Sequence, residues 1–392
     1  MISARKKLIV YKVIIAVFAF IVAFMPSTVL RSREANSRVV VELIGVDGGD
    51  KVSVTAQYVM PTETQGATSK DVVTVSANAV TEAVELLSTA LGRRAELGHC
   101  SMIIVGETAT PDHLATLMTA TDVTADVYLA AAEGEASELV GDITEFMKKT
   151  GVTDADFIAY GVNKAHIATN TLLDFLCDIG SASRSSFLPI VEMLEEEGSG
   201  GSGGESSGGG SDSGGESSGG GEKSSKKMTG MEINKLALFG ENGRVGIMQE
   251  KAARGVAWVS APIEKGILTA DVDIDGETVK NVSARLLKKH VEIKARPDKS
   301  IKITIRAVIE PHGDKFNEVD SRNTAEASAA LKAGFSETVK SELVAAFDAS
   351  VEQGCDVLFI GKEFYRHYPD YFETEFDLAN TEVEYEVDIS VK

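Results

Sequence analysis

The chain has 392 residues, of which 43% are hydrophobic and 25% are charged, and its formal net charge is −20. This length is enough for two or three domains with buried cores. So acidic a chain repels the phosphate backbones of DNA and RNA, which argues against nucleic-acid binding. Its three cysteines, Cys100, Cys177 and Cys355, are odd in number and far apart, so the sequence indicates neither a disulfide framework nor a CxxC metal site.

Residues 1–37 differ from the rest of the chain in charge and hydropathy. They carry a net charge of +5, which leaves −25 for the remainder. Val13–Met25 is an unbroken apolar run behind four basic residues, and the stretch from Leu8 approaches the roughly 20 residues that cross a bilayer. We expect a cytoplasmic tip and an uncleaved single-pass membrane anchor, with a removed signal peptide as the alternative. The bulk of the chain is then extracytoplasmic, because the basic flank stays inside.

Residues 38–135 alternate between strand and helix patterns. The Asp47-Gly48-Gly49-Asp50 sequence is a strong hairpin signal between the first two expected strands. Apolar periodicity predicts an N-terminal α/β domain with strands at 38–46, 51–60, 71–75, 102–105 and 125–131 and helices at 81–91 and 112–118.

Residues 136–267 form the expected middle domain, with helices at 137–149 and 171–178. Residues 198–227 interrupt it with a Gly/Ser tract that has no apolar residue and is predicted to be a disordered coil. This tract is either a linker between independent domains or a loop inserted into one sheet. The second interpretation follows from Phe187–Met193 and Ile233–Phe239, which are both strand-like, and from the slow growth of loop-closure cost with length.

Residues 268–392 are expected to be a C-terminal α/β domain. Strand patterns start at residue 267 and end in the alternating segment Thr381–Val391. Between them, Thr324–Gln353 reads as one long helix whose apolar residues fall at every fourth position, so the apolar stripe winds around it. A twisted sheet buries such a helix best. The predicted fold class is therefore α+β: three mixed α/β domains after a transmembrane helix, the last an antiparallel sheet wrapped around a long helix.

Three patterns suggest chemistry, and each has a stronger structural interpretation. Asp271, Asp273 and Asp275 copy the first half of a calcium loop, but Val282 stands where a bidentate Glu is required, so a strand and hairpin are expected. His99 and Cys100 are adjacent and would face opposite sides of a strand, which favours a structural pair over a nucleophile. The chain shows no zinc spacing, GxSxG or Walker A sequence, so we expect no metal, no cofactor and no enzyme activity.

Tyr365, Arg366 and Tyr368 are the candidate interface residues. Together with His367 they form a polar and aromatic cluster before Pro369, and such residues are enriched at protein interfaces. The alternative is that they cover the core of the last domain.

Four segments in this order resemble the Ger(x)C family, the C subunits of spore germinant receptors. The first is LIGVD at 43–47, and the second is AVELLSTALGRRAELGHCSMIIVGE at 83–107. The third, residues 236–266, is similar to the family in Phe239, Gly246, Glu250, Gly255, Trp258 and Gly266. The fourth is CDVLFIGKEFYRHYP at 355–369.

The resemblance implies a non-enzymatic extracytoplasmic subunit that positions or stabilises polytopic membrane partners of a germinant receptor. Family members are usually lipoproteins, whereas residues 1–99 contain no cysteine, so here the apolar helix is expected to anchor the protein. Two alternatives from other classes are a membrane-anchored cell-envelope enzyme and a solute-sensing domain.

Overall fold

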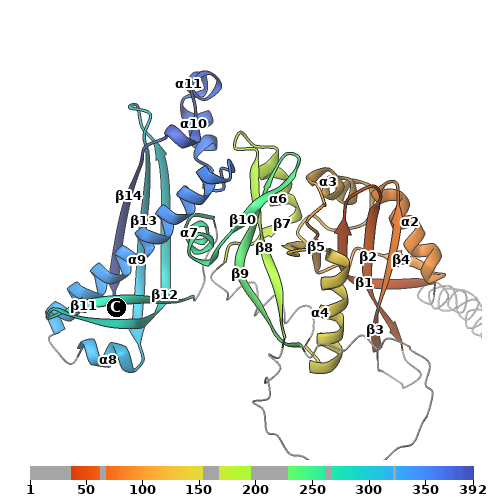
Figure 1. Cartoon of the computed structure of the whole chain (residues 1–392), viewed down its shortest axis with the longest axis horizontal. Coiled ribbons are helices and arrows are strands. Elements are labelled where there is room, and N and C mark those ends of the chain that lie inside the picture. The colour runs from red at the N-terminus through yellow and green to blue at the C-terminus, as the bar shows by residue number, and fades with distance from the viewer. Residues whose placement is uncertain (1–36, 62–67, 153–166, 196–227, 261–265, 321–323) are drawn as a thin grey trace, which may run out of the picture.

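The computed structural model describes residues 37–61, 68–152, 167–195, 228–260, 266–320 and 324–392. These residues form two sheets, one of ten strands and one of four, with helices packed on both (Figure 1). The predicted membrane anchor and the Gly/Ser tract at 198–227 both lie outside the described residues. Within the described part of the chain, no helix has the length and hydropathy that crossing a membrane requires.

The large sheet is mixed. β1 (Arg38–Asp47) lies near its centre, antiparallel to β2 (Val52–Pro61) and parallel to β5 (Met102–Val105). Two short strands pair off the main path, β4 (Arg94–Glu96) with β1 and β7 (Asn170–Thr171) with β6 (Tyr128–Ala131). The main strands follow in spatial order: β10 (Gly243–Met248), β9 (Met228–Gly240), β8 (Ser185–Glu195), β6 (Tyr128–Ala131), β5 (Met102–Val105), β1 (Arg38–Asp47), β2 (Val52–Pro61) and β3 (Thr68–Ala77).

The two strands that flank the Gly/Ser tract are neighbours in this sheet. β8 and β9 pair antiparallel along their length, from Ser185 opposite Gly240 to Glu195 opposite Met228. This pairing supports the inserted-loop interpretation, because the described residues on either side of the tract, Glu195 and Met228, lie opposite each other in one sheet.

Helices cover both faces of the large sheet and enclose two cores. α2 (Val80–Leu91), α3 (Pro111–Ala120) and α6 (Leu172–Ile179) border one core. α4 (Ala136–Thr150) covers the other face, and that second core continues past α7 (Glu250–Ser260) into the four-stranded sheet. The two sheets are thus joined by continuous apolar packing.

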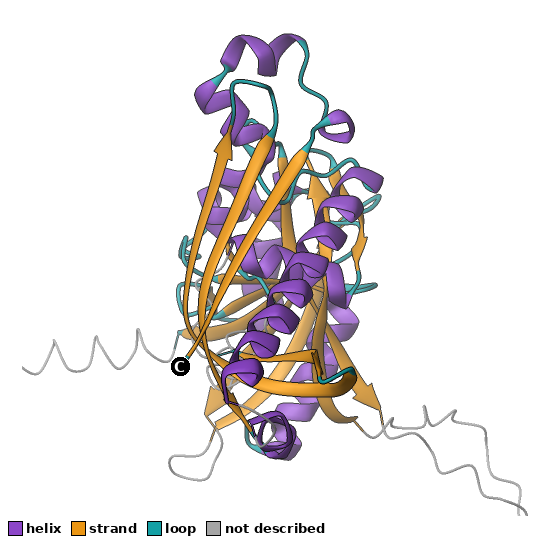
Figure 2. Cartoon of the chain, turned by 90° about the vertical axis from the view of Figure 1, so that its left-hand side faces the viewer, coloured by secondary structure: helices purple, strands orange, loops and turns teal. Residues whose placement is uncertain are grey.

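The four-stranded sheet curls beside a long helix (Figure 2). The helix, α9 (Thr324–Glu352), contacts α7, the first strand of the sheet and the last. The predicted apolar stripe is buried at Leu331, Phe335, Val339 and Leu343, as expected from the sequence. Its last two members, Phe347 and Val351, are only half-buried. The strands are β11 (Ile267–Ile274), β12 (Glu277–Ala295), β13 (Ile301–His312) and β14 (Val383–Val391).

The prediction that this sheet is antiparallel was wrong for its last strand. β14 runs parallel to β13, from Val383 beside Ile301 to Val391 beside Ile309. The reason lies in the connection, which passes through α8 (Asp314–Asp320), α9, α10 (Ile360–His367) and α11 (Pro369–Thr374). These helices carry the chain back to the end where β13 begins, so the next strand repeats its direction.

The division into three domains stays a prediction. The expected N-terminal and middle domains contribute strands to one sheet, although β6 and β8 meet at the single pair Ala131 and Ile190. α4, which follows the expected boundary at residue 135, packs against β1, β2 and β3.

Candidate interaction site

The three candidate interface residues lie around α10, at one end of the four-stranded sheet. In Figure 1, α10 and α11 stand at the top, near the ends of β12 and β13. Tyr365 is 53% exposed, and Arg366 pairs with Glu363 one turn earlier. Tyr368 is half-buried against the core, and the Lys299 ammonium stands 4.6 Å from its ring centroid. The structure thus exposes Tyr365 and Arg366 and leaves Tyr368 partly covered.

Aromatic rings fix α10 against α11. Phe364 is buried and meets Tyr371 edge-on, with centroids 5.2 Å apart. Tyr365 meets Phe372 edge-on at 5.6 Å, and Phe372 stacks on Phe376 at 5.2 Å. Edge-to-face and stacked pairs at these separations are favourable. Phe364 of α10 therefore belongs to the core of the last unit, whereas Tyr365 is exposed, and the role of the candidate interface residues stays a prediction.

Tyr365 and Arg366 line a groove of about 980 Å³ between the two sheets. One wall is the loop that joins α6 to β8, together with Glu241 at the turn between β9 and β10. The other wall is built by α10, α11 and the residues that follow α11. The lining residues are Ile179, Gly180, Ser181, Ala182, Ser183, Arg184, Glu241, Asp356, Lys362, Tyr365, Arg366, Phe372, Glu373 and Phe376.

Asp356 forms the floor of the groove and caps α10. Its Oδ1 accepts from the Ile360 N–H at 2.9 Å, and its Oδ2 accepts from the Gly361 N–H at 2.7 Å and from the Ser183 hydroxyl at 2.7 Å. A side-chain oxygen at this place satisfies N–H groups that the first turn of a helix leaves free. Burial raises the pKa of Asp356, while these hydrogen bonds act in the opposite direction. Its carboxylate is therefore a structural acceptor.

Asp178, near the end of α6, is a half-buried acid beside the groove. Burial raises the pKa of Asp178 to about 6, while Lys362 and hydrogen bonds with Ser186 and Asn170 oppose the rise. The Lys362 ammonium lies 4.0 Å from Asp178 Oδ1. The Lys362 side chain therefore connects α10 with α6, which packs on the large sheet. The backbone N–H of Lys362 also donates to the Ser183 hydroxyl at 3.2 Å.

Sequence reasoning missed one whole wall of this groove. Ser183 and Arg184 lie in a short loop without a recognisable motif, and they stand more than 170 positions before the residues they face. Arg184 has a positive φ of 46°, which is part of a tight turn in this loop. No pattern in the sequence predicts this turn. Only Tyr365 and Arg366 had a local signal, namely aromatic and basic residues next to Pro369.

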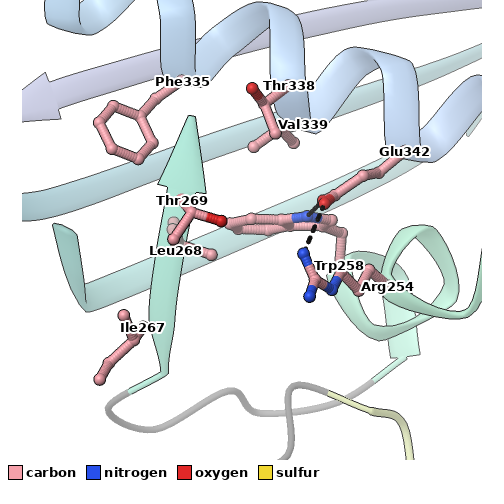
Figure 3. A pocket seen from close by; sticks show the side chains of 9 residues that line it. All are labelled: Arg254, Trp258, Ile267, Leu268, Thr269, Phe335, Thr338, Val339 and Glu342. Carbon is pink, nitrogen blue, oxygen red and sulfur yellow. Dashed lines mark hydrogen bonds and ion pairs between the residues drawn. The ribbon is translucent and has the colours of Figure 1, made fainter. Parts of the chain in front are cut away.

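A second, small pocket lies where α7 crosses α9. The Trp258 indole donates a hydrogen bond to Glu342 Oε2 at 2.7 Å, and the Arg254 guanidinium stands 3.9 Å from Oε1 (Figure 3). Burial raises the pKa of Glu342, and the Trp258 hydrogen bond lowers it. The helices approach closely at Gly255, where an added Cβ would lie 2.1 Å from the Glu342 carbonyl oxygen. The pocket measures about 20 Å³, which is room for a water molecule and not for an organic ligand.

The calcium-like segment is a strand and hairpin, as expected. Asp271 Oδ1 accepts from the Asn281 N–H at 2.9 Å, and Asp273 accepts from the Thr278 hydroxyl. Asp275 and Gly276 both have positive φ, at 55° and 80°, which is the geometry of a tight hairpin turn. In the described part of the chain, no group of three or more His, Cys, Asp or Glu side chains is arranged to hold a metal ion.

The adjacent pair His99 and Cys100 is divided between surface and core. Cys100 is buried and its thiol lies 3.1 Å from the Met102 carbonyl oxygen, whereas His99 is exposed. The two side chains therefore have separate surroundings, which supports the structural interpretation of the cysteine.

Two of the sequence motifs meet at the start of α4. Asp47 accepts from the Ala136 N–H at 2.7 Å and from the Ser137 N–H at 3.0 Å, so it caps this helix. Gly106 packs against the same carboxylate, and an added Cβ there would lie 1.9 Å from Asp47 Oδ1. The LIGVD segment at 43–47 and the end of the segment at 83–107 therefore share a structural role.

The described residues thus define a mixed α/β protein with two sheets. It has an aromatic cluster on α10 and α11 and a groove between the sheets. Two family models match the chain: "Spore germination protein N-terminal domain" over residues 31–193 and "Spore germination B3/ GerAC like, C-terminal" over residues 234–392. The chain belongs to this GerAC-like, or Ger(x)C, family of spore germination proteins, which confirms the resemblance seen in the sequence.

Similarity to individual proteins is weaker. No curated protein matches the chain. One solved structure, "Crystal Structure of the GerBC protein", aligns with 89% of this chain and 96% of its own, at 12% identity and a TM-score of 0.49.

Proposed function

We propose that the protein is the C subunit of a germinant receptor and acts by contact rather than by catalysis. The observation that carries this proposal is the pair of family models, which together account for residues 31–193 and 234–392. In this role the chain positions or stabilises polytopic membrane subunits. In this proposal the apolar segment at residues 13–25 tethers it to the membrane, with its bulk outside the cytoplasm.

The chemistry of the buried acids supports a role based on contact. Asp47 and Asp356 each accept hydrogen bonds from the first N–H groups of a helix, and Glu342 accepts from an indole. A catalytic carboxylate needs an open side toward a substrate. These three carboxylates are instead used to hold helices in place.

Purification of the full chain from detergent-solubilised membranes tests the proposal. We expect a polytopic membrane protein to co-purify with it in a fixed ratio and to remain bound after size-exclusion chromatography. The matched control is an unrelated single-pass protein with the same tag and expression level. Recovery of the full chain as an isolated monomer would contradict the proposal.

A further inference from the structure

One edge of the large sheet carries no further strand among the described residues. β3 is the last strand in the sheet order and pairs with β2 at all ten of its positions without a bulge. α2 and α4 pack against its two faces. Val72 lies against the core under α4, and Val73 and Val75 lie against the core under α2. β3 is therefore held from three sides, and its outer backbone edge stays open.

Two hydrogen bonds show which backbone groups lie on this open edge. The Val75 carbonyl oxygen accepts from the Ser53 hydroxyl of β2 at 3.3 Å, so this carbonyl points into the sheet. Backbone groups alternate in direction along a strand, so those of Val72, Thr74 and Ser76 point outward. The Val72 N–H agrees with this direction, because it donates to the side chain of Asp71 at 2.9 Å. Another strand can therefore bind β3 through these outward groups.

The outer strands at the other sheet edges have features that hinder pairing with another chain. At the opposite edge of the large sheet, Gly246 of β10 lies so close to Gln353 that an added Cβ would be 2.2 Å from its side-chain oxygen. β11 has a bulge at Asp271. β14 exposes three acids that an antiparallel second copy would place opposite one another, namely Glu384, Glu386 and Asp388. β3 has no bulge, no proline and no glycine.

The two charged side chains of β3 are already engaged within the chain. The Lys70 ammonium pairs with Glu42 of β1 at 2.8 Å, and Asp71 accepts from the Val72 N–H. The centre of the strand, residues 72–75, is uncharged and consists of β-branched residues, which favour strand pairing. The open edge therefore fits an uncharged, β-branched strand, and β3 is itself such a strand.

We propose that β3 pairs antiparallel with β3 of a second copy of this chain, with Val73 opposite its own copy on a two-fold axis. Val72 then lies opposite Thr74, and their outward N–H and C=O groups form hydrogen bonds. Lys70 lies opposite Ser76, so no like charges meet. Such a contact closes both open edges at once, whereas a strand from another protein would close only one of them.

The contact is small, so attachment of both copies to one membrane is what makes it form. β3 has ten residues, whereas a standard protein interface uses about 20–30 residues a side. Two copies on one membrane meet at a much higher effective concentration than in solution. The inference rests on the proposed function for this membrane attachment, and it needs no polytopic partner.

Disulfide cross-linking of the full chain in membranes tests this pairing. Single cysteines replace residues 72, 73 and 74 in turn, in a Cys177→Ser background that leaves only the buried thiols of Cys100 and Cys355. We expect Val73→Cys to give a disulfide-linked dimer in at least fivefold higher yield than its two neighbours, because only this side chain lies opposite its own copy. Ser390→Cys, at an exposed position on β14, measures the yield from random collisions.

Two substitutions of Thr74 separate edge pairing from folding. Thr74→Pro and Thr74→Val both remove the hydroxyl that hydrogen-bonds with the Thr55 hydroxyl at 2.9 Å, but only proline also removes the outward N–H. In the Val73→Cys chain, Thr74→Pro should reduce the dimer at least tenfold, whereas Thr74→Val should retain it. Circular dichroism should give the two variants the same melting temperature. The cysteine series contains no proline and tests the pairing by itself.

Three results would overturn the proposal: a yield at position 73 no higher than at position 390, a maximum at position 72 or 74, or a disulfide from position 73 to a different polypeptide. If a polytopic subunit co-purifies with the chain but position 73 gives no dimer, the strand pairing is wrong while the proposed function stands.

Discussion

The hydroxyl of Ser183 donates a hydrogen bond of 2.7 Å to Oδ2 of Asp356. Ser183 precedes β8 of the large sheet, and Asp356 precedes α10 beside the four-stranded sheet. Ser185 adds to this junction, because its hydroxyl accepts from the Asp356 N–H at 3.0 Å. One buried aspartate therefore caps a helix and at the same time ties the two parts of the molecule together.

Replacing this aspartate should destabilise the fold. Asp356→Ala leaves the N–H groups of Ile360 and Gly361 and the Ser183 hydroxyl without their acceptor, and we expect a loss of about 2–3 kcal/mol. Urea unfolding measures the change. Glu310→Ala, at an exposed strand position, is the control and should stay within about 0.5 kcal/mol of the unaltered protein. Equal losses for the two variants would show that Asp356 has no such role.

Two glycines within helices should respond to alanine in opposite directions. At Gly255 the added Cβ meets the Glu342 carbonyl oxygen at 2.1 Å, so Gly255→Ala must force α7 and α9 apart, at a cost of about 3 kcal/mol. At Gly141 of α4 an added Cβ meets nothing within 4 Å, and Gly141→Ala should stabilise by about 1 kcal/mol. Thermal denaturation of both variants measures these two changes in stability. An unchanged or higher melting temperature for Gly255→Ala would mean that α7 and α9 are not in close contact, and a lower one for Gly141→Ala would contradict the open space at Gly141.

Lys289 should make stability depend on alkaline pH. Its ammonium donates to the Ala257 and Trp258 carbonyl oxygens at the end of α7, each at 2.8 Å, and burial lowers the pKa of Lys289 from 10.5 to about 8. The unfolded chain therefore binds this proton more tightly than the folded one. Stability should rise with pH between about 8 and 10.5, because the cost of a buried charge disappears.

Lys289→Met isolates this effect, since all other groups titrate in both proteins. The free energy of unfolding of the unaltered protein, relative to the variant, should increase from pH 7.5 to pH 10, by on the order of 3 kcal/mol at most. Guanidinium unfolding at each pH gives the difference. A difference that stays flat over this range would contradict burial of the ammonium.

Cutting the chain within residues 198–227 should leave the two fragments together. β8 and β9 pair on either side of the tract, and the parts of both strands away from it are buried, at 187–191 and 236–239. A protease recognition sequence placed at residues 207–213 allows a single cut in the full chain. We expect the fragments to co-elute from a size-exclusion column and to separate only in denaturant. Separate elution without denaturant would show that the tract links independent domains.

Local structure was largely predictable from the sequence. The hairpin at Asp275-Gly276, the helix at 137–149 and the winding stripe of α9 all follow from patterns within a few residues, since periodicity and turn chemistry act over that range. The direction of β14 was not predictable from its own residues. An alternating strand has the same pattern whether its neighbour is parallel or antiparallel, so the path of the connecting helices decided it.

The candidate site was predictable only in part. Tyr365 and Arg366 stood out because of their residue types, but the groove also needs Ser183 and Arg184, which the fold brings to them from a distant loop. Asp356 is part of a motif in the sequence. The sequence could not show that its carboxylate caps α10 by accepting hydrogen bonds from the first turn of this helix.

The sequence by itself determined the acidic character of the body, the apolar segment at residues 13–25, most of the helices and strands, and the resemblance to one family. These depend on composition and on short-range order. The tertiary structure alone decided that β8 and β9 pair across the Gly/Ser tract, that β14 is parallel to β13, and that two separate loops form one groove. Those features arise from burial and hydrogen bonding between residues far apart in the chain, and no local pattern encodes which distant surfaces meet.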